Sequence, residues 1–212
     1  MHTHINDYTY VVVDVETTGM SRSDRICEIG MTKIRGGDIV DKFETLVDPQ
    51  MRITNTMYHG IEDWMARRAP SFVDVAHRVT AFISGTVLIA HNAPFDMRFL
   101  RYELQRLDAD LSHHVLCTLK IARELHPDFP SHRLEYLLQK YRIRNDFPHR
   151  AGSDADAEAR LFLQMRPRMW KYGMDTLASL KIWGLPYNYV WCETIKVRSR
   201  HNGWMLTRDD LW

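Results

Sequence analysis

The stretch YVVVDVETTG, residues 10–19, decides the fold. Tyr10–Val15 is apolar and rich in β-branched residues, which predicts a buried strand ended by Glu16–Gly19. Because residues two apart in a strand share a face, Asp14 and Glu16 would lie side by side at its end. Such carboxylates repel each other unless a cation neutralises them, and oxygen ligands favour Mg²⁺ or Mn²⁺. A solvated strand end is the alternative, and this motif taken alone favours that alternative over a metal site.

Outward from this stretch, the pattern alternates between strands and helices. The Gly-Gly pair in Arg35–Asp38 predicts a hairpin between two further strands. The remaining expected elements are strands at 26–34, 39–47 and 86–90, and helices at 71–83, from Pro94, at 118–125, 132–141 and 153–165. Ser71, Ser131 and Ser153 are the expected N-caps. The predicted fold class is α/β, a mixed sheet flanked by helices on its faces.

Two regions are predicted along the chain. Residues 1–166 carry the strand and helix pattern and would form one domain. Residues 167–212 hold five of the six tryptophans and predict an ordered C-terminal extension packed on that domain, of unknown function. Within the extension, Tyr189–Val197 alternates, and Asn202-Gly203 predicts a hairpin turn into Trp204–Leu206.

Composition limits the function classes without choosing among them. The 212 residues contain no apolar run long enough to cross a membrane, so no membrane association is expected. The polar segment Met1–Tyr8 lacks the apolar core of a signal peptide, and three well-separated cysteines favour a reducing compartment, so we expect a cytoplasmic location. A net charge of +1 means that any nucleic-acid contact must come from a local patch or from metal ions.

Two later motifs place acidic residues at helix starts. In His91–Asp96 (HNAPFD), Asp96 lies in the first turn of the helix opened by Pro94, where the helix dipole alone would stabilise it. In His149–Ala155 (HRAGSDA), Asp154 would occupy another first turn, and His149 the loop before it. Taken singly, His149 fits an exposed loop histidine better than a catalytic one.

Taken together, the three motifs resemble one family. The patterns D-x-E-T-T-G, H-N-A-x-F-D and H-R-A-x-x-D-A, in this order over residues 8–166, are similar to those of DnaQ-like (DEDDh) exonucleases. The resemblance implies a ribonuclease H-like fold and metal-dependent 3′→5′ hydrolysis of DNA, single-stranded or frayed, that releases nucleoside 5′-monophosphates. Trimming of RNA 3′ ends remains an alternative, as does a catalytically silent scaffold or proofreading accessory subunit.

The resemblance also implies residue roles. Asp14, Glu16, Asp96 and Asp154 would hold two divalent cations, Mg²⁺ or Mn²⁺, with His149 as the general base. The candidate substrate-binding residues are Thr17, Thr18, His59, Ile61, Asn92 and Phe95. Phe95 fits a core position better than a substrate contact. Arg150 would either contact the nucleic-acid backbone or be a solvated surface charge. The implied partners are a nucleic acid with a free 3′ end and a polymerase or other DNA-processing protein, with the oligomeric state open.

Overall fold

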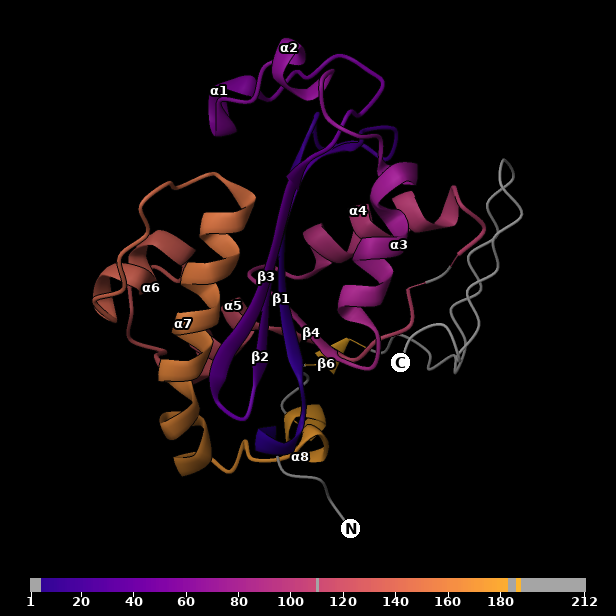
Figure 1. The fold of residues 1–212 in the computed structure, drawn as a ribbon. Coiled ribbons are helices and arrows are strands. Elements are labelled where there is room, and N and C mark those ends of the chain that lie inside the picture. The colour runs from indigo at the N-terminus through magenta and orange to yellow at the C-terminus, as the bar shows by residue number, and fades with distance from the viewer. Residues whose placement is uncertain (1–4, 110, 183–185, 188–212) are drawn as a thin grey trace.

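The computed structural model describes residues 5–109, 111–182 and 186–187 of the chain (Figure 1). The predicted alternation in Tyr189–Val197 and the predicted hairpin at Asn202-Gly203 into Trp204–Leu206 lie outside the described residues. No helix in the described part is both long and apolar enough to cross a bilayer.

A mixed sheet forms the centre of the molecule, as predicted. Its strands are β1 (Tyr10–Thr17), β2 (Ile26–Arg35), β3 (Asp38–Leu46), β4 (Val87–Ala90), β5 (Val115–Cys117) and β6 (Pro186–Tyr187). They lie in the order β3-β2-β1-β4-β5-β6, with β1 antiparallel to β2 and parallel to β4. The β2–β3 hairpin turns at Gly36 and Gly37, whose φ angles of 62° and 98° favour glycine. Sequence reasoning did not predict β5 or β6.

Helices cover both faces of the sheet (Figure 1). Besides the 3-10 turn η1 (Ile5–Asp7), they are α1 (Thr56–His59), α2 (Asp63–Ala66), α3 (Phe72–Ile83), α4 (Pro94–Gln105), α5 (Thr118–Leu125), α6 (Leu134–Lys140), α7 (Ala151–Lys171) and α8 (Leu177–Ile182). One buried cluster joins the sheet to α5, α6 and α7, and a second joins its other face to α3 and α4. The N-cap of α3 is Ser71, as predicted, and it forms a capping box with Asp74, which was not predicted.

The alternation of β1 between these two clusters positions the carboxylates. Val11, Val13 and Val15 belong to the cluster on the α3 and α4 side. Tyr10 and Val12 belong to the cluster on the α7 side, where the Tyr10 ring lies 5.2 Å from the ring of Phe162. By the same two-residue period, Asp14 and Glu16 continue the α7-facing row. The row therefore changes from apolar to acidic where it reaches the first turn of α7.

Two predicted N-caps are wrong. The helix α6 is preceded by Arg133 and not by Ser131, and α7 by Arg150 and not by Ser153. Ser153 lies inside the first turn of α7, where its hydroxyl donates to Asn145 Oδ1 at 2.5 Å and accepts the Phe147 N–H at 3.2 Å. Its hydroxyl therefore closes the preceding loop, and a partner from β2 takes over the cap, as described below.

The helix α7 crosses the predicted domain boundary. It continues through Pro167 to Lys171, and Met169 and Met174 join the core cluster on the α7 side. The division at 166/167 stays a prediction, but it does not coincide with the end of a helix.

The start of α7 approaches the sheet at Gly30, which pairs with Asp14 across β1 and β2. A Cβ atom on Gly30 would overlap the carbonyl of Ala151 and the backbone nitrogen of Gly152. Since both are backbone atoms of a helix, they cannot move without shifting α7. The absence of a side chain at Gly30 thus lets the first turn of α7 lie over the acidic end of β1.

We predict that Gly30→Ala lowers the free energy of unfolding by about 1–3 kcal/mol, because overpacking would push α7 from the sheet. Gly152→Ala is the matched control. Its Cβ would meet the end of the flexible Glu44 side chain, which can move aside, and alanine favours a helix. Urea denaturation followed by circular dichroism measures both. Equal losses in the two variants would contradict the assigned role of Gly30.

Candidate active site

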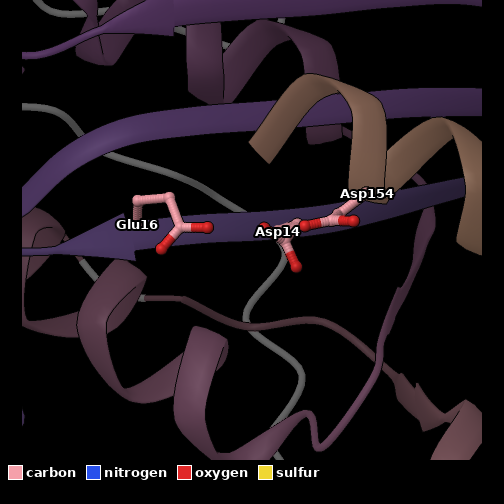
Figure 2. Close-up of side chains that lie close together, drawn as sticks. All are labelled: Asp14, Glu16 and Asp154. Atoms are coloured by element: carbon pink, nitrogen blue, oxygen red, sulfur yellow. The ribbon is translucent and has the colours of Figure 1, made fainter. Parts of the chain in front are cut away.

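Three of the four predicted metal ligands lie together. Asp14 and Glu16 project from β1 and Asp154 from the first turn of α7, and one oxygen from each lies within 4.8 Å of the others (Figure 2). We call these three side chains the carboxylate cluster. Asp14 and Glu16 are partly exposed and Asp154 is buried, so the cluster lies at the rim of the core and is reachable from solvent.

The fourth predicted ligand, Asp96, lies beside the cluster and not within that distance. It is buried in the first turn of α4, and its Oδ1 accepts the backbone N–H of Val15 at 3.2 Å. That bond joins α4 to the strand residue between Asp14 and Glu16. The Asp96 charge is near enough to help raise the pKa of Asp14.

Burial and mutual repulsion act on all four carboxyl groups. The pKa of Asp14 is raised well above its usual value, first by burial and then by the charges of Asp96, Asp154 and Glu16. Burial also raises the pKa of Glu16 and of Asp96 to about 8, and the pKa of Asp154 is raised for the same reason. An oxygen-only set of like charges in this state fits a hard divalent cation such as Mg²⁺ or Mn²⁺, which would offset the repulsion.

His149 lies on the loop before α7 with a φ of 60°, uncommon for a residue other than glycine. Its backbone N–H donates to Asp154 Oδ2 at 2.9 Å, while its imidazole Nε2 lies 3.3 Å from Glu135 Oε1. The side chain is 55% exposed. The structure therefore holds the His149 backbone against the carboxylate cluster, with the ring at the surface beside α6.

Glu28 and Arg150 support the carboxylate cluster. Of the two, only Arg150 was singled out from the sequence. Glu28 is buried opposite Glu16 on β2, and its Oε2 accepts the Ala151 N–H at 2.8 Å. Its other oxygen lies 2.5 Å from Arg150 Nη2. Arg150 is thus engaged in an ion pair and is not a free surface charge. Glu28 satisfies an N–H at the start of α7, the position that the helix dipole makes favourable for an anion.

A second buried group that the sequence did not indicate lies one turn along α7 from Asp154. Glu158 Oε1 is 2.6 Å from the Thr118 hydroxyl, which is also 2.9 Å from His91 Nδ1. His91 Nε2 lies 2.9 Å from the His132 carbonyl, and burial lowers the pKa of His91 to about 4.

In this chain of bonds the Thr118 hydroxyl donates to Glu158 Oε1. Burial raises the pKa of Glu158 to about 8, with further contributions from the charges of Asp96 and Asp154. The chain connects α7, the start of α5 and the H-N-A-x-F-D loop. It therefore fixes the segments that carry Asp154 and Asp96 relative to each other.

The predicted substrate-binding threonines are buried at the end of β1. The Thr17 hydroxyl donates to the Gly19 carbonyl at 2.7 Å, and the Thr18 hydroxyl to Asp24 Oδ1 at 3.0 Å. These bonds close the turn that follows the strand.

The other predicted substrate-binding residues lie around the same end of the sheet. His59 is buried with Nε2 3.2 Å from the Thr17 carbonyl, and Ile61 is fully buried in a small cluster under α1 and α2. Asn92 is exposed with a φ of 66°. Phe95 is partly buried, its ring 5.0 Å from that of Phe99. Contact of any of these residues with substrate stays a prediction, and Ile61 would have to leave its cluster to make one.

Comparison with known proteins gives a consistent result. Residues 11–162 match the family model RNase_T, described as exonuclease. DNA polymerase III PolC-type of Bacillus subtilis is 40% identical over 169 residues, which are 77% of this chain and 12% of the relative. The chain thus spans about an eighth of the length of such curated relatives.

Solved structures show the same fold. Exonuclease X in complex with 5′ overhanging duplex DNA has a TM-score of 0.62 and 26% identity, covering 77% of this chain and 93% of that one. E. coli exonuclease I in complex with a dT13 oligonucleotide has a TM-score of 0.71 at 19% identity, covering 78% of this chain and 42% of that one. The expected DnaQ-like family and ribonuclease H-like fold are therefore confirmed.

We predict that the chain in EDTA becomes less stable to heat as pH rises from 5 to 8.5. Carboxyl groups whose pKa is raised on folding stabilise the protein below their unfolded pKa, near 4, and lose that contribution as pH passes the folded value, about 8 for Glu16 and Asp96. Mg²⁺ should raise the melting temperature more at pH 8.5, where the carboxylates are ionised. Differential scanning fluorimetry measures both effects.

Glu16→Gln is the control for this experiment, because it keeps the shape of the side chain and removes one titrating group. Its melting temperature should fall less with pH and respond less to Mg²⁺. A pH-independent melting temperature in EDTA, or an equal gain from Mg²⁺ at both pH values, would contradict the prediction.

Proposed function

Since the chain belongs to the exonuclease family whose model it matches, we propose that it hydrolyses DNA stepwise from the 3′ end and releases nucleoside 5′-monophosphates. The observation that carries the proposal is the carboxylate cluster of Asp14, Glu16 and Asp154 at the rim of the core, with Asp96 beside it. Single-stranded or frayed ends are the expected substrate, since the terminal phosphodiester must reach the end of β1 between the starts of α4 and α7.

Asp14, Glu16, Asp96 and Asp154 would hold two divalent cations, Mg²⁺ or Mn²⁺. When bound, such cations neutralise the carboxylates, lower the pKa of water and stabilise negative charge on a phosphoryl group. The hydrogen bonds to Asp96 from Val15 N–H and to Asp154 from His149 N–H keep these two ligands in place.

His149 is the proposed general base. Its ring would leave Glu135 and turn toward the cluster, a movement that its exposed position on the loop permits. The imidazole takes a proton from water as the water oxygen bonds to phosphorus. The bond from phosphorus to the 3′ oxygen of the preceding nucleotide breaks, and that oxygen gains a proton. The products are a nucleoside 5′-monophosphate and a strand shorter by one nucleotide.

The relatives favour DNA as the polymer and a polymerase or other DNA-processing protein as the partner, because several are named DNA polymerase III PolC-type and the Exonuclease X structure contains DNA. A cytoplasmic location remains part of the proposal, and the buried free thiols of Cys27 and Cys117 are compatible with it.

We predict that the wild-type chain with Mg²⁺ converts 5′-labelled single-stranded DNA into a ladder that shortens from the 3′ end, and that EDTA stops it. Asp14→Asn should abolish turnover because it removes a charge from the cluster. Asp156→Asn is the matched control, since this carboxylate two residues from Asp154 pairs with Lys42 and Arg160 instead. RNA of the same sequence is tested in parallel, and if RNA is cleaved faster than DNA, the proposed substrate becomes RNA. If neither DNA nor RNA is cleaved, the remaining hypothesis is a catalytically silent scaffold.

His149→Ala is predicted to lower kcat by about 10²–10⁴-fold while leaving DNA affinity nearly unchanged, because the loss of a general base acts on the chemical step. Glu135→Gln serves as the control, because it removes only the surface partner of the ring. A variant that keeps the wild-type kcat would remove His149 from the mechanism.

A further inference from the structure

An open pocket of about 650 Å³ lies on the α1–α2 segment, outside the carboxylate cluster. Its lining includes one tryptophan and three arginines, namely Arg52, Trp64, Arg67 and Arg68, and we call it the arginine–tryptophan pocket. Trp64 is 59% exposed, and the Arg68 guanidinium carbon lies 5.8 Å from the centre of its ring. Exposure of the apolar indole surface to water is unfavourable, so an exposed tryptophan among three arginines suggests that a ligand covers it.

The acidic residues in this pocket are already engaged. Glu62 Oε2 accepts the Trp64 indole N–H at 2.7 Å. Asp63 Oδ1 accepts the Ile53 N–H at 2.8 Å, and its other oxygen lies 3.7 Å from Arg67. Within the described part of the chain, no carboxylate lies within 4.0 Å of the Arg52 or Arg68 guanidinium. These two cations are therefore available to an external anion.

The pocket is fixed to the strand end that carries the catalytic acids. The Thr54 N–H and hydroxyl both donate to the Thr18 carbonyl, at 2.9 and 2.6 Å. Arg52 lies two residues before Thr54, and His59, the last residue of α1, has its Nε2 3.2 Å from the Thr17 carbonyl. Figure 1 shows α1 and α2 beyond the end of the sheet at which α7 begins. A strand with its 3′ end at the carboxylate cluster has this surface nearby.

We propose that the arginine–tryptophan pocket binds single-stranded DNA upstream of the 3′-terminal nucleotide, an inference that rests on the proposed function. A base stacks on the exposed face of Trp64, and Arg52 and Arg68 bind backbone phosphates through their planar guanidinium groups. Stacking on an aromatic ring accepts every base, which suits an enzyme that removes nucleotides in sequence. The combination of unpaired guanidinium groups and a flat ring favours a nucleic acid over an apolar protein surface.

The test is the affinity for fluorescein-labelled oligothymidylates of 3 and 12 nucleotides, measured by fluorescence anisotropy with Ca²⁺ in place of Mg²⁺. Trp64→Ala should weaken binding of the 12-mer by about tenfold, as expected for the loss of one stacked base, and binding of the 3-mer by less than twofold. Arg52→Ala with Arg68→Ala should reduce the slope of log affinity against log salt by about 1.4, or two phosphate contacts on a single strand.

Two matched variants serve as controls. Trp170→Ala removes another exposed tryptophan that lies near an arginine, Arg166, on the last turns of α7. Arg35→Ala removes an exposed arginine at the β2–β3 hairpin, the opposite end of β1 from Glu16. Neither should change the affinity for the 12-mer, and the melting temperatures of all variants establish that they are folded.

A second readout separates this inference from the proposed function. Hydrolysis of thymidine 5′-monophosphate p-nitrophenyl ester needs the carboxylate cluster. Because this ester is too short to reach the pocket, the pocket variants should hydrolyse it at the wild-type rate. Wild-type affinity for the 12-mer in folded pocket variants would overturn the pocket while hydrolysis stands. If the pocket variants lose affinity for the 12-mer while the wild-type chain hydrolyses neither the ester nor DNA, the pocket is supported and the exonuclease activity is overturned.

Discussion

The mutual repulsion of acids held at the edge of the core is the constraint on which the site depends. Asp14 continues a row of β1 whose earlier members, Tyr10 and Val12, are core, and the charges of Asp96 and Asp154 lie near enough to raise its pKa. Backbone donors hold two of these acids in place, Val15 N–H for Asp96 and His149 N–H for Asp154. These donors position the carboxyl groups, and burial makes the groups costly to ionise, which fits the binding of a divalent cation.

The topology brings these acids together from distant parts of the chain. Because β4 runs parallel to β1, the loop after it delivers the start of α4 to the end of β1 at which Glu16 lies. The start of α7 reaches the same place over Gly30. Both helix starts also offer N–H groups and a favourable dipole to the acids in their first turns. The fold therefore places acidic residues where backbone electrostatics offsets part of their repulsion.

Local patterns of the sequence predicted the parts of this arrangement that are local. The two-residue period of β1 placed Asp14 beside Glu16, and the Gly-Gly pair located the hairpin. Ser153 was misassigned as an N-cap because serine favours that position, whereas in the structure Glu28, 123 residues away along the chain, accepts the Ala151 N–H. No local pattern reports such a contact. The three-residue strand β5 and the bonds of Glu158 with Thr118 depend on tertiary packing for the same reason.

A net charge of +1 poses the question of how this chain would hold a polyanion. Cations bound by the carboxylate cluster would supply positive charge at the reacting phosphate, where the protein itself is acidic. The arginine–tryptophan pocket would supply it farther along the strand, on a segment that packs on its own small cluster of Cys27, Ile53, Ile61 and Ala66. Because that cluster is separate from the two main cores, contacts with DNA there need not displace Asp14 or Asp154. Affinity and chemistry would then rest on different parts of one surface.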